Sequence, residues 1–199
     1  MKSKILAKYP GSVFVVMRSN IFYVADFTKR TQNQRGVEIH VSQPCNPNDP
    51  TKLMPCLVVE NPNGISIDCN VFDDCQFVDG GGNQLKHGEC CFFPSSNDAA
   101  SWFSIVEIKD CLPFKASKYK QDIQEKMDSM FQIFRNDASV ANRIYFIVSF
   151  PRRKTAMNDT IYIDYVAIKK YKGFFPLVSN YVVIADAQTI DVKKTLCGA

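Results

Sequence analysis

The stretch that decides the fold reads ECCFFP at residues 89–94 and WFSIVEIK at residues 102–109, with a polar break between them. Two apolar runs around a polar break are typical of a β-hairpin. The second run is apolar on both faces up to Glu107 and Lys109, which predicts a central strand covered on both sides. Period-two alternation puts these two charged residues on the face of Phe103. Because charges at the end of a buried strand are costly to desolvate, we expect them to be paired with each other or with a metal ion and a phosphate.

An amphipathic helix is predicted directly after the hairpin, over residues 118–135. Its apolar residues recur at spacings of four, three and four and form one stripe, namely Ile123, Met127, Met130 and Phe134. Residues 143–150, RIYFIVSF, then form another apolar run typical of a buried strand. The predicted unit is therefore hairpin, helix, strand.

This order resembles the PD-(D/E)XK nuclease superfamily, in which an acidic residue, a strand, a turn and a strand ending in Glu-x-Lys precede an amphipathic helix. The resemblance covers about residues 65–150, and its Glu-x-Lys half is Glu107-Ile108-Lys109. The earlier acid, usually Asp in that superfamily, is best matched by Glu89. Other acidic residues compete for that place: Asp73, Asp74, Asp79 and Asp98. The superfamily also commonly opens with a helix that carries another acid, and the sequence offers no clear match to it.

The resemblance implies an α/β fold with a restriction-endonuclease-like central mixed sheet, few helices and additional β structure at both ends. We expect a single nuclease-like domain with a β-rich part at residues 1–60, the motif-bearing core at 65–150 and a β-rich part at 151–199. Residues 12–17 and 21–25 are predicted to pair as a hairpin, and residues 43–55, which hold four prolines, to form a loop. Further strands are expected at residues 37–41, 57–60, 65–72, 160–168 and 181–185.

The activity that the resemblance implies is divalent-metal-dependent phosphodiester hydrolysis, with a DNA endonuclease as the favoured interpretation. Glu89, Glu107 and Lys109 would be the catalytic residues, with Lys109 orienting water or neutralising the transition state. The implied ligands of Mg²⁺ or Mn²⁺ are the carboxylates of Glu89 and Glu107, the backbone carbonyl of Ile108, and Asp74 or Asp79. The glycine run at residues 80–82 lacks the Gly-Lys-Ser/Thr of a phosphate-binding loop, so we interpret it as a turn.

Nucleic acid is the expected partner, although a net charge of only +4 means that a local patch would have to bind it. Two basic clusters are the candidates for contacts to the phosphate backbone: Arg152, Arg153 and Lys154, and then Lys169, Lys170 and Lys172. A solvated loop accounts for the first cluster equally well, and a plain surface rim for the second.

Two other functions stay open on the sequence alone. One is a catalytically degenerate binding or assembly module with the same fold, and the other is an interaction protein with no role in nucleic-acid chemistry. Geometry separates the enzyme from the binding module, because an enzyme requires the side chains of Glu89, Glu107 and Lys109 to converge in one cleft.

The cellular setting is predicted from the cysteines and from the lack of membrane signals. The eight cysteines are irregularly spaced and form no Cys-x-x-Cys, and with only two histidines a zinc site is not expected. No secretory signal is recognisable, and no apolar stretch is long enough to span a bilayer. We therefore expect a cytoplasmic protein with reduced cysteines and no membrane partner.

Overall fold

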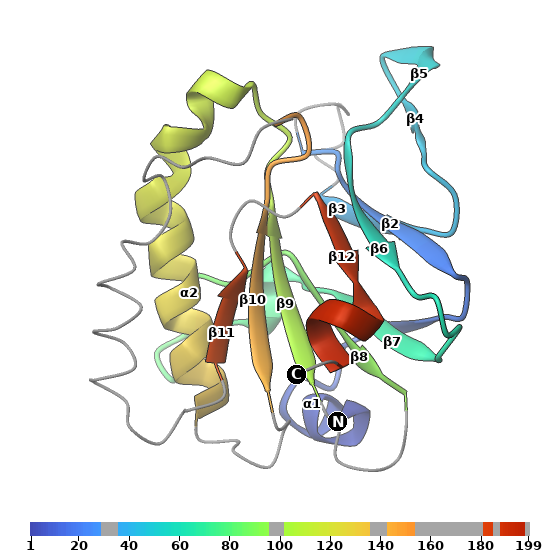
Figure 1. Ribbon diagram of the computed structural model, residues 1–199. Helices are drawn as coiled ribbons and strands as arrows, with labels where there is room; N and C mark the ends of the chain where they lie inside the picture. The colour runs from blue at the N-terminus through green and yellow to red at the C-terminus, as the bar shows by residue number, and fades with distance from the viewer. Residues whose placement is uncertain (29–35, 96–101, 136–142, 154–180, 185–187, 198–199) are drawn as a thin grey trace.

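Helix α2 (Lys120–Arg135), a six-stranded sheet and a four-stranded sheet form successive layers of an α/β protein (Figure 1). The computed structural model describes residues 1–28, 36–95, 102–135, 143–153, 181–184 and 188–197. The six-stranded sheet has the order β1 (Phe14–Met17), β7 (Ile67–Val71), β8 (Cys90–Pro94), β9 (Phe103–Ile108), β10 (Ile144–Ser149) and β11 (Tyr181–Ile184). The four-stranded sheet has the order β12 (Thr189–Asp191), β6 (Cys56–Glu60), β2 (Ile21–Asp26) and β3 (Val37–His40).

The remaining described elements are short. Strands β4 (Cys45–Asn46) and β5 (Asp49–Leu53) pair with each other, and α1 (Lys2–Lys8) lies near the C-terminal end of α2, where Lys8 Nζ donates to Ile133 O. Two 3-10 helices, η1 (Asp74–Gln76) and η2 (Pro113–Tyr119), and a π-helix over Val192–Cys197 complete them.

Strand β9 is an interior strand, as its sequence predicts. It runs antiparallel to β8 and parallel to β10, and all six of its residues are buried. The six-residue pairing of β9 with β10 and the return of the chain through α2 produce the predicted order of hairpin, helix and strand.

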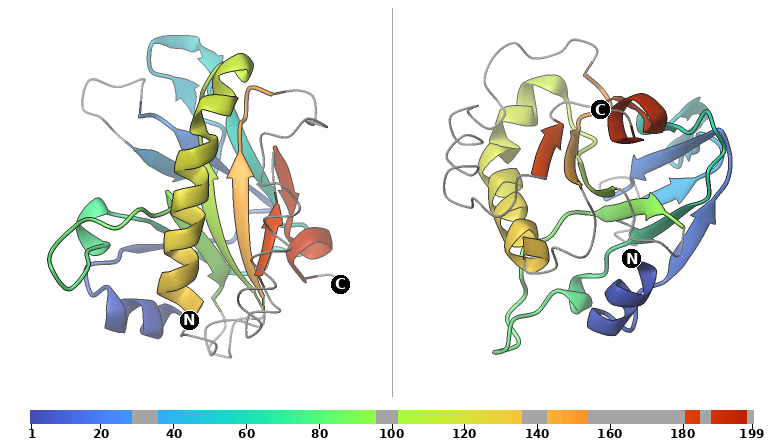
Figure 2. Two further views of the ribbon diagram at one scale, coloured as in Figure 1. Left: turned by 90° about the vertical axis from the view of Figure 1, so that its left-hand side faces the viewer. Right: turned by 60° about the horizontal axis from the view of Figure 1, so that its bottom comes forward.

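The two faces of the central sheet are covered by different layers, as the two further views show (Figure 2). On one face, the ring of Phe103 lies 5.0 Å from that of Phe134 in α2. On the other, the ring of Phe92 lies 5.7 Å from that of Phe22 in β2. Neighbouring residues of one strand point to opposite faces, so Glu107 belongs to the face of Phe103 and α2.

The apolar stripe of α2 is buried as predicted. Ile123, Met127, Met130 and Phe134 are all at most 4% exposed. The helix begins at Lys120, two residues later than its pattern indicates, because the preceding residues form the 3-10 helix η2 that starts at Pro113.

The prediction of a hairpin over residues 12–25 is wrong. Both strands exist, but β1 pairs with β7 in the six-stranded sheet and β2 pairs with β3 and β6 in the four-stranded sheet. An apolar run defines a strand locally, whereas its partner depends on which faces meet in the core. Residues 43–55 likewise contain β4 and β5 rather than only a loop.

The three parts expected along the chain are interleaved in space. Strand β1 from the N-terminal part and β11 from the C-terminal part are the described edges of the motif-bearing sheet, while β12 joins the N-terminal strands of the other sheet. The strand expected at residues 160–168 lies outside the described residues. The seven cysteines whose side chains are described are all free, as expected.

Gly88 allows the chain to enter β8 close to β9. A Cβ atom at this position would lie 2.7 Å from Ile105 Cγ2 and 3.1 Å from Val106 O. Because these atoms belong to a buried strand, we expect Gly88→Ala to lower the free energy of unfolding by about 1–3 kcal/mol, measured by urea denaturation. Gly80→Ala is the matched control, since its Cβ would meet nothing within 4 Å. Equal stability of the two variants would contradict this close approach.

Candidate functional site

Four charged side chains meet where the β8–β9 hairpin faces α2. Glu89 directly precedes β8, Glu107 is in β9, Lys109 follows β9, and Lys126 comes from α2. The antiparallel register pairs Cys90 with Val106, so one step further along the register Glu89 lies level with Glu107. Lys109 is held in place by its backbone N–H, which donates to Ser149 O at 3.0 Å.

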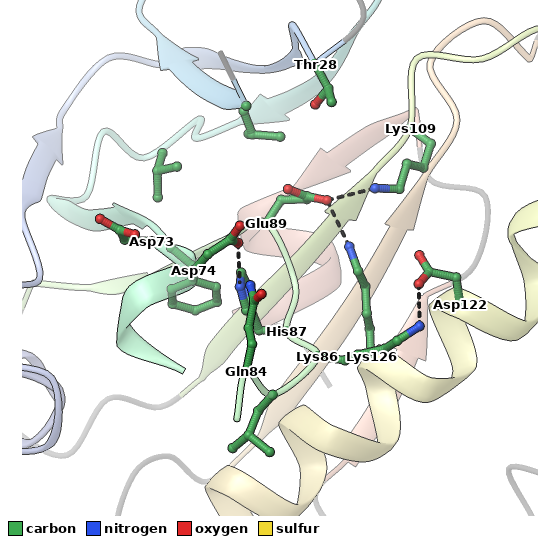
Figure 3. A pocket seen from close by; sticks show the side chains of 15 residues that line it. Thr28, Asp73, Asp74, Gln84, Lys86, His87, Glu89, Lys109, Asp122 and Lys126 are labelled. Carbon is green, nitrogen blue, oxygen red and sulfur yellow. Dashed lines mark hydrogen bonds and ion pairs between the residues drawn. The ribbon is translucent and has the colours of Figure 1, made fainter. Parts of the chain in front are cut away.

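Both lysines bridge the same two carboxylates. Lys109 Nζ lies 2.8 Å from Glu89 Oε1 and 3.0 Å from Glu107 Oε1. Lys126 Nζ lies 3.0 Å from each of these two oxygen atoms and 3.1 Å from Glu107 Oε2. Figure 3 shows Glu89 pointing toward both ammonium groups. The side chains of Glu89, Glu107 and Lys109 therefore converge, as the enzyme interpretation requires, and their position relative to the pocket decides whether they share one cleft.

The four groups differ in their access to solvent. The side chain of Glu107 is 0% exposed, whereas those of Lys126, Lys109 and Glu89 are 15%, 20% and 21% exposed. The three partly exposed residues line a pocket of about 1110 Å³, and Glu107 does not line it. Glu107 therefore lies behind the wall of the pocket that the other three help to form.

The pocket has a mixed electrostatic character. Its lining includes four carboxylates and three lysines: Asp73, Asp74, Glu89, Asp122, Lys86, Lys109 and Lys126. The Nζ of Lys86 lies 2.8 Å from Asp122 Oδ1, as Figure 3 shows, and also 2.7 Å from Glu125 Oε2. The three lysines thus belong to two clusters of ion pairs. Lys86 pairs with carboxylates of α2, and Lys109 and Lys126 pair with the two glutamates.

The shared lysines affect the two glutamates differently. Burial raises the pKa of Glu107 to about 7, because desolvation and the charge of Glu89 outweigh the attraction of the lysines. Burial also acts to raise the pKa of Glu89, but Lys109 and Lys126 outweigh it and hold that pKa below its usual value. For Lys109, burial opposes the charged form, yet both carboxylates keep its pKa above the ordinary value. Glu89 therefore ionises before Glu107.

His87 contacts protein oxygen atoms through both ring nitrogens. Its Nδ1 lies 2.6 Å from Gly88 O and its Nε2 lies 2.9 Å from Asp74 Oδ1, while its ring stacks on Phe77 at 4.6 Å. These contacts tie the segment leading into Glu89 to η1. We assign His87 a positioning role for this segment, because its two nitrogens face the protein itself.

The other two predicted metal ligands do not join the glutamates. Asp74 lines the pocket with its carboxylate against His87, and Asp79 closes the glycine turn by accepting from the N–H groups of Gly81 and Asn83. Across the described ranges, no three His, Cys, Asp or Glu side chains form a group that could hold a metal ion. Ile108, the remaining predicted ligand, lies between Glu107 and Lys109 with its side chain fully buried.

The predicted basic clusters are only partly described. The guanidinium of Arg152 forms a two-point ion pair with Asp110, whose side chain is 4% exposed, and Arg153 is itself buried. Both arginines are thus part of the protein's own packing where we expected phosphate contacts. Lys154, Lys169, Lys170 and Lys172 lie outside the described residues.

Lys126 is the member of this charged cluster that the sequence did not predict. It lies three residues after Ile123 and four before Met130, so it projects from the buried side of α2. A lysine between two apolar positions of a helical stripe is the signal that points to it. The position of Lys126 in the stripe does not predict which residues it pairs with, because Glu89 and Glu107 come from a hairpin earlier in the chain.

Comparison with protein-family models, curated proteins and solved structures gives no match to this chain. Among the helices of the described residues, none combines the length and the apolar character needed to cross a membrane. The geometry of the Glu89, Glu107, Lys109 and Lys126 cluster and the Glu-x-Lys motif are therefore the features from which a function can be inferred.

The burial of Glu107 predicts a pH-dependent stability. Its pKa is near 4.5 unfolded and about 7 folded, so the folded protein binds this proton more tightly and stability falls as pH rises between these values. The substitution Glu107→Gln removes the ionisable group and with it the loss of stability at rising pH. We expect the variant to gain on the order of 3 kcal/mol relative to wild type between about pH 5 and pH 8, measured by urea denaturation.

Glu125→Gln is the control for this experiment. Glu125 is an exposed carboxylate whose pKa is lowered, chiefly by the side chain of Lys86. Its titration therefore changes the stability of the protein only at a pH below the range tested for Glu107. Its stability relative to wild type should stay constant from about pH 5 to pH 8. A constant difference between Glu107→Gln and wild type over that range would refute the buried proton.

Proposed function

We propose that this protein hydrolyses phosphodiester bonds in nucleic acid, most readily DNA, with a divalent metal ion. The observation that carries the proposal is the convergence of three side chains beside a large pocket: Glu89 and Lys109 line it, and the carboxylate of Glu107 lies behind them in contact with Lys109. Two carboxylates beside a lysine are the groups that this chemistry needs, since carboxylates bind the metal ion and an ammonium stabilises charge on phosphate.

The topology around these residues supports a restriction-endonuclease-like fold. An antiparallel pair of strands carries Glu89 and Glu107, an amphipathic helix follows, and the next strand returns parallel to β9. This is the order of elements on which the resemblance to the PD-(D/E)XK superfamily was based. The described residues add a second sheet on the face opposite α2, which agrees with extra β structure at both ends of the chain.

The donor atoms suit Mg²⁺ or Mn²⁺. Mg²⁺ is commonly held by one or two carboxylates and completes its shell with water and substrate phosphate, so Glu89 and Glu107 suffice without Asp74 or Asp79. When bound, the ion would polarise a phosphate oxygen and lower the pKa of a coordinated water.

The chain's own residues have separate tasks in this mechanism. Glu89 and Glu107 would hold the ion, and the buried position of Glu107 fixes its carboxylate. Lys109, tied to the strand by its backbone, presents its ammonium beside both carboxylates and would neutralise charge that develops on the phosphate. His87 and Gly88 set the position of Glu89, the one ligand outside a strand.

A catalytically degenerate binding module is the alternative that specific observations favour. Glu89 stands where the superfamily usually has Asp, and α1, whose sequence is KSKILAK, has no acidic residue. The two glutamates are also neutralised by two lysines within the protein. Binding of nucleic acid with no cleavage in the presence of either Mg²⁺ or Mn²⁺ would establish this alternative.

Cleavage of single- and double-stranded DNA and RNA in the presence of Mg²⁺ or Mn²⁺ tests the proposal. We expect Lys109→Met to lower the cleavage rate by about 100-fold to 1,000-fold, because the charge that stabilises the transition state is lost. Lys52→Met is the control, since Lys52 is exposed and paired with Asp49 away from the pocket. Activity that survives in Lys109→Met, or that needs no divalent ion, would refute this mechanism.

A further inference from the structure

Lys126 lies where the proposed metal ion would have to bind. Its Nζ lies 3.0 Å from Glu89 Oε1 and 3.0 Å from Glu107 Oε1, the same two atoms that Lys109 contacts, and 3.1 Å from Glu107 Oε2. Lys126 Nζ thus contacts three of the four carboxylate oxygens, and Lys109 Nζ contacts Glu89 Oε1 and Glu107 Oε1. A cation that bridges the glutamates is therefore already present, and it belongs to α2.

The route by which an ion could reach Glu107 from the pocket also involves Lys126. The carboxylate of Glu107 has no exposed surface, and the pocket wall in front of it is formed by Glu89, Lys109 and Lys126. An ion that enters from the pocket can reach Glu107 only when one lysine moves. Lys109 lies directly after β9, two residues beyond Glu107, whereas Lys126 reaches the site from α2, whose residue Asp122 also lines the pocket.

Charge balance gives a reason for such a movement. Two carboxylates and two ammonium groups sum to zero when all four are ionised, so a divalent cation would leave two uncompensated positive charges in a largely buried cluster. When the ammonium of Lys126 moves away from Glu89 and Glu107, the excess positive charge beside these carboxylates is reduced. A phosphate group of the substrate, which carries negative charge, compensates the remainder.

The pocket offers Lys126 a second position. Asp122 lines the same pocket and lies four residues earlier on the same helix, and its pKa is lowered despite burial through Lys86 and then Lys126. The ammonium of Lys126 can therefore turn from the glutamates toward the pocket without losing a nearby negative charge. A phosphodiester in the pocket would lie beside it.

We propose that Lys126 is an internal counter-ion that holds the metal position in the free protein and moves to the substrate phosphate when metal and nucleic acid bind. The inference rests on the proposed function, because it assigns the metal position to the glutamates. It makes Lys126 a phosphate-binding residue and predicts that metal and substrate bind with positive coupling. By linkage, each ligand then raises the affinity for the other by the same factor.

Binding of Mn²⁺ alone, measured by isothermal titration calorimetry, tests the first half of this proposal without any cleavage. We expect Lys126→Met to bind Mn²⁺ at least about tenfold more tightly than wild type, because the competing positive charge is removed. Lys86→Met is the matched control, since Lys86 is another pocket lysine but pairs with Asp122 and Glu125. It should bind Mn²⁺ within about twofold of wild type.

Removal of a counter-ion from buried carboxylates also risks unfolding of the variant. Lys126→Gln keeps a hydrogen-bond donor without the charge and is the second variant, and circular dichroism checks the folding of both. Unchanged or weaker Mn²⁺ binding by the folded variant, with measurable binding by wild type, would overturn the role of Lys126 and leave the proposed function intact. Absence of Mn²⁺ binding in all four proteins, even at millimolar concentration, would overturn both.

The second half is tested with a short phosphorothioate DNA strand, which resists cleavage. We expect the strand to tighten Mn²⁺ binding to wild type by about tenfold, and to have a clearly smaller effect on Lys126→Gln, because the ammonium that moves to the phosphate is missing. Equal coupling in the two proteins would refute the transfer of Lys126 to the substrate.

Discussion

The carboxylate of Glu107, buried without solvent contact in the middle layer of the protein, is the constraint on which the arrangement of the site depends. An ionised carboxylate at this depth is tolerated only with positive partners in good geometry. One partner, Lys109, lies directly after the same strand, two residues beyond Glu107 in the sequence. The other, Lys126, comes from α2, so the helix must settle on the sheet in the one rotation that directs residue 126 toward β9. The need to pair the buried carboxylate of Glu107 with Lys126 thus determines how the apolar face of α2 packs on the sheet.

The apolar contacts make that rotation possible. Phe134 packs on Phe103 two turns beyond Lys126, and Ile123 and Met130 are buried on either side of the lysine. Because side chains alternate along β9, Phe103 and Glu107 share the face that α2 covers. A slip of one residue in the β8–β9 register would turn Glu89 away from that face and would separate the two glutamates. The same packing therefore provides stability and aligns the charged groups.

The sequence was informative wherever a pattern is local. The alternation in β9 and the stripe of α2 depend on neighbouring residues, so both elements and the shared face of Glu107 and Lys109 could be predicted. Strand partners could not, because β1 and β2 are adjacent in sequence yet belong to different sheets. The same limit applies to Arg152, whose partner Asp110 lies in another part of the chain. Lys126 was missed for a related reason: its position in the stripe is visible, but its pairing with two glutamates exists only in the folded protein.

The balance of charge also explains how such a site can be stable before any ligand binds. Without the lysines, the neighbouring carboxylates of Glu89 and Glu107 would repel each other. A protein that relied on a metal ion to relieve that repulsion would be stable only where the metal is abundant. With two ammonium groups of its own, the cluster carries no excess negative charge, so the repulsion between the carboxylates is relieved without an ion. In the proposed mechanism the metal ion has to displace an ammonium group that already pairs with the carboxylates, which lowers the affinity for the ion. For the hydrolase that we propose, the negative phosphate of the substrate would compensate the positive charge that the metal ion adds, so the ion would bind most tightly together with the substrate.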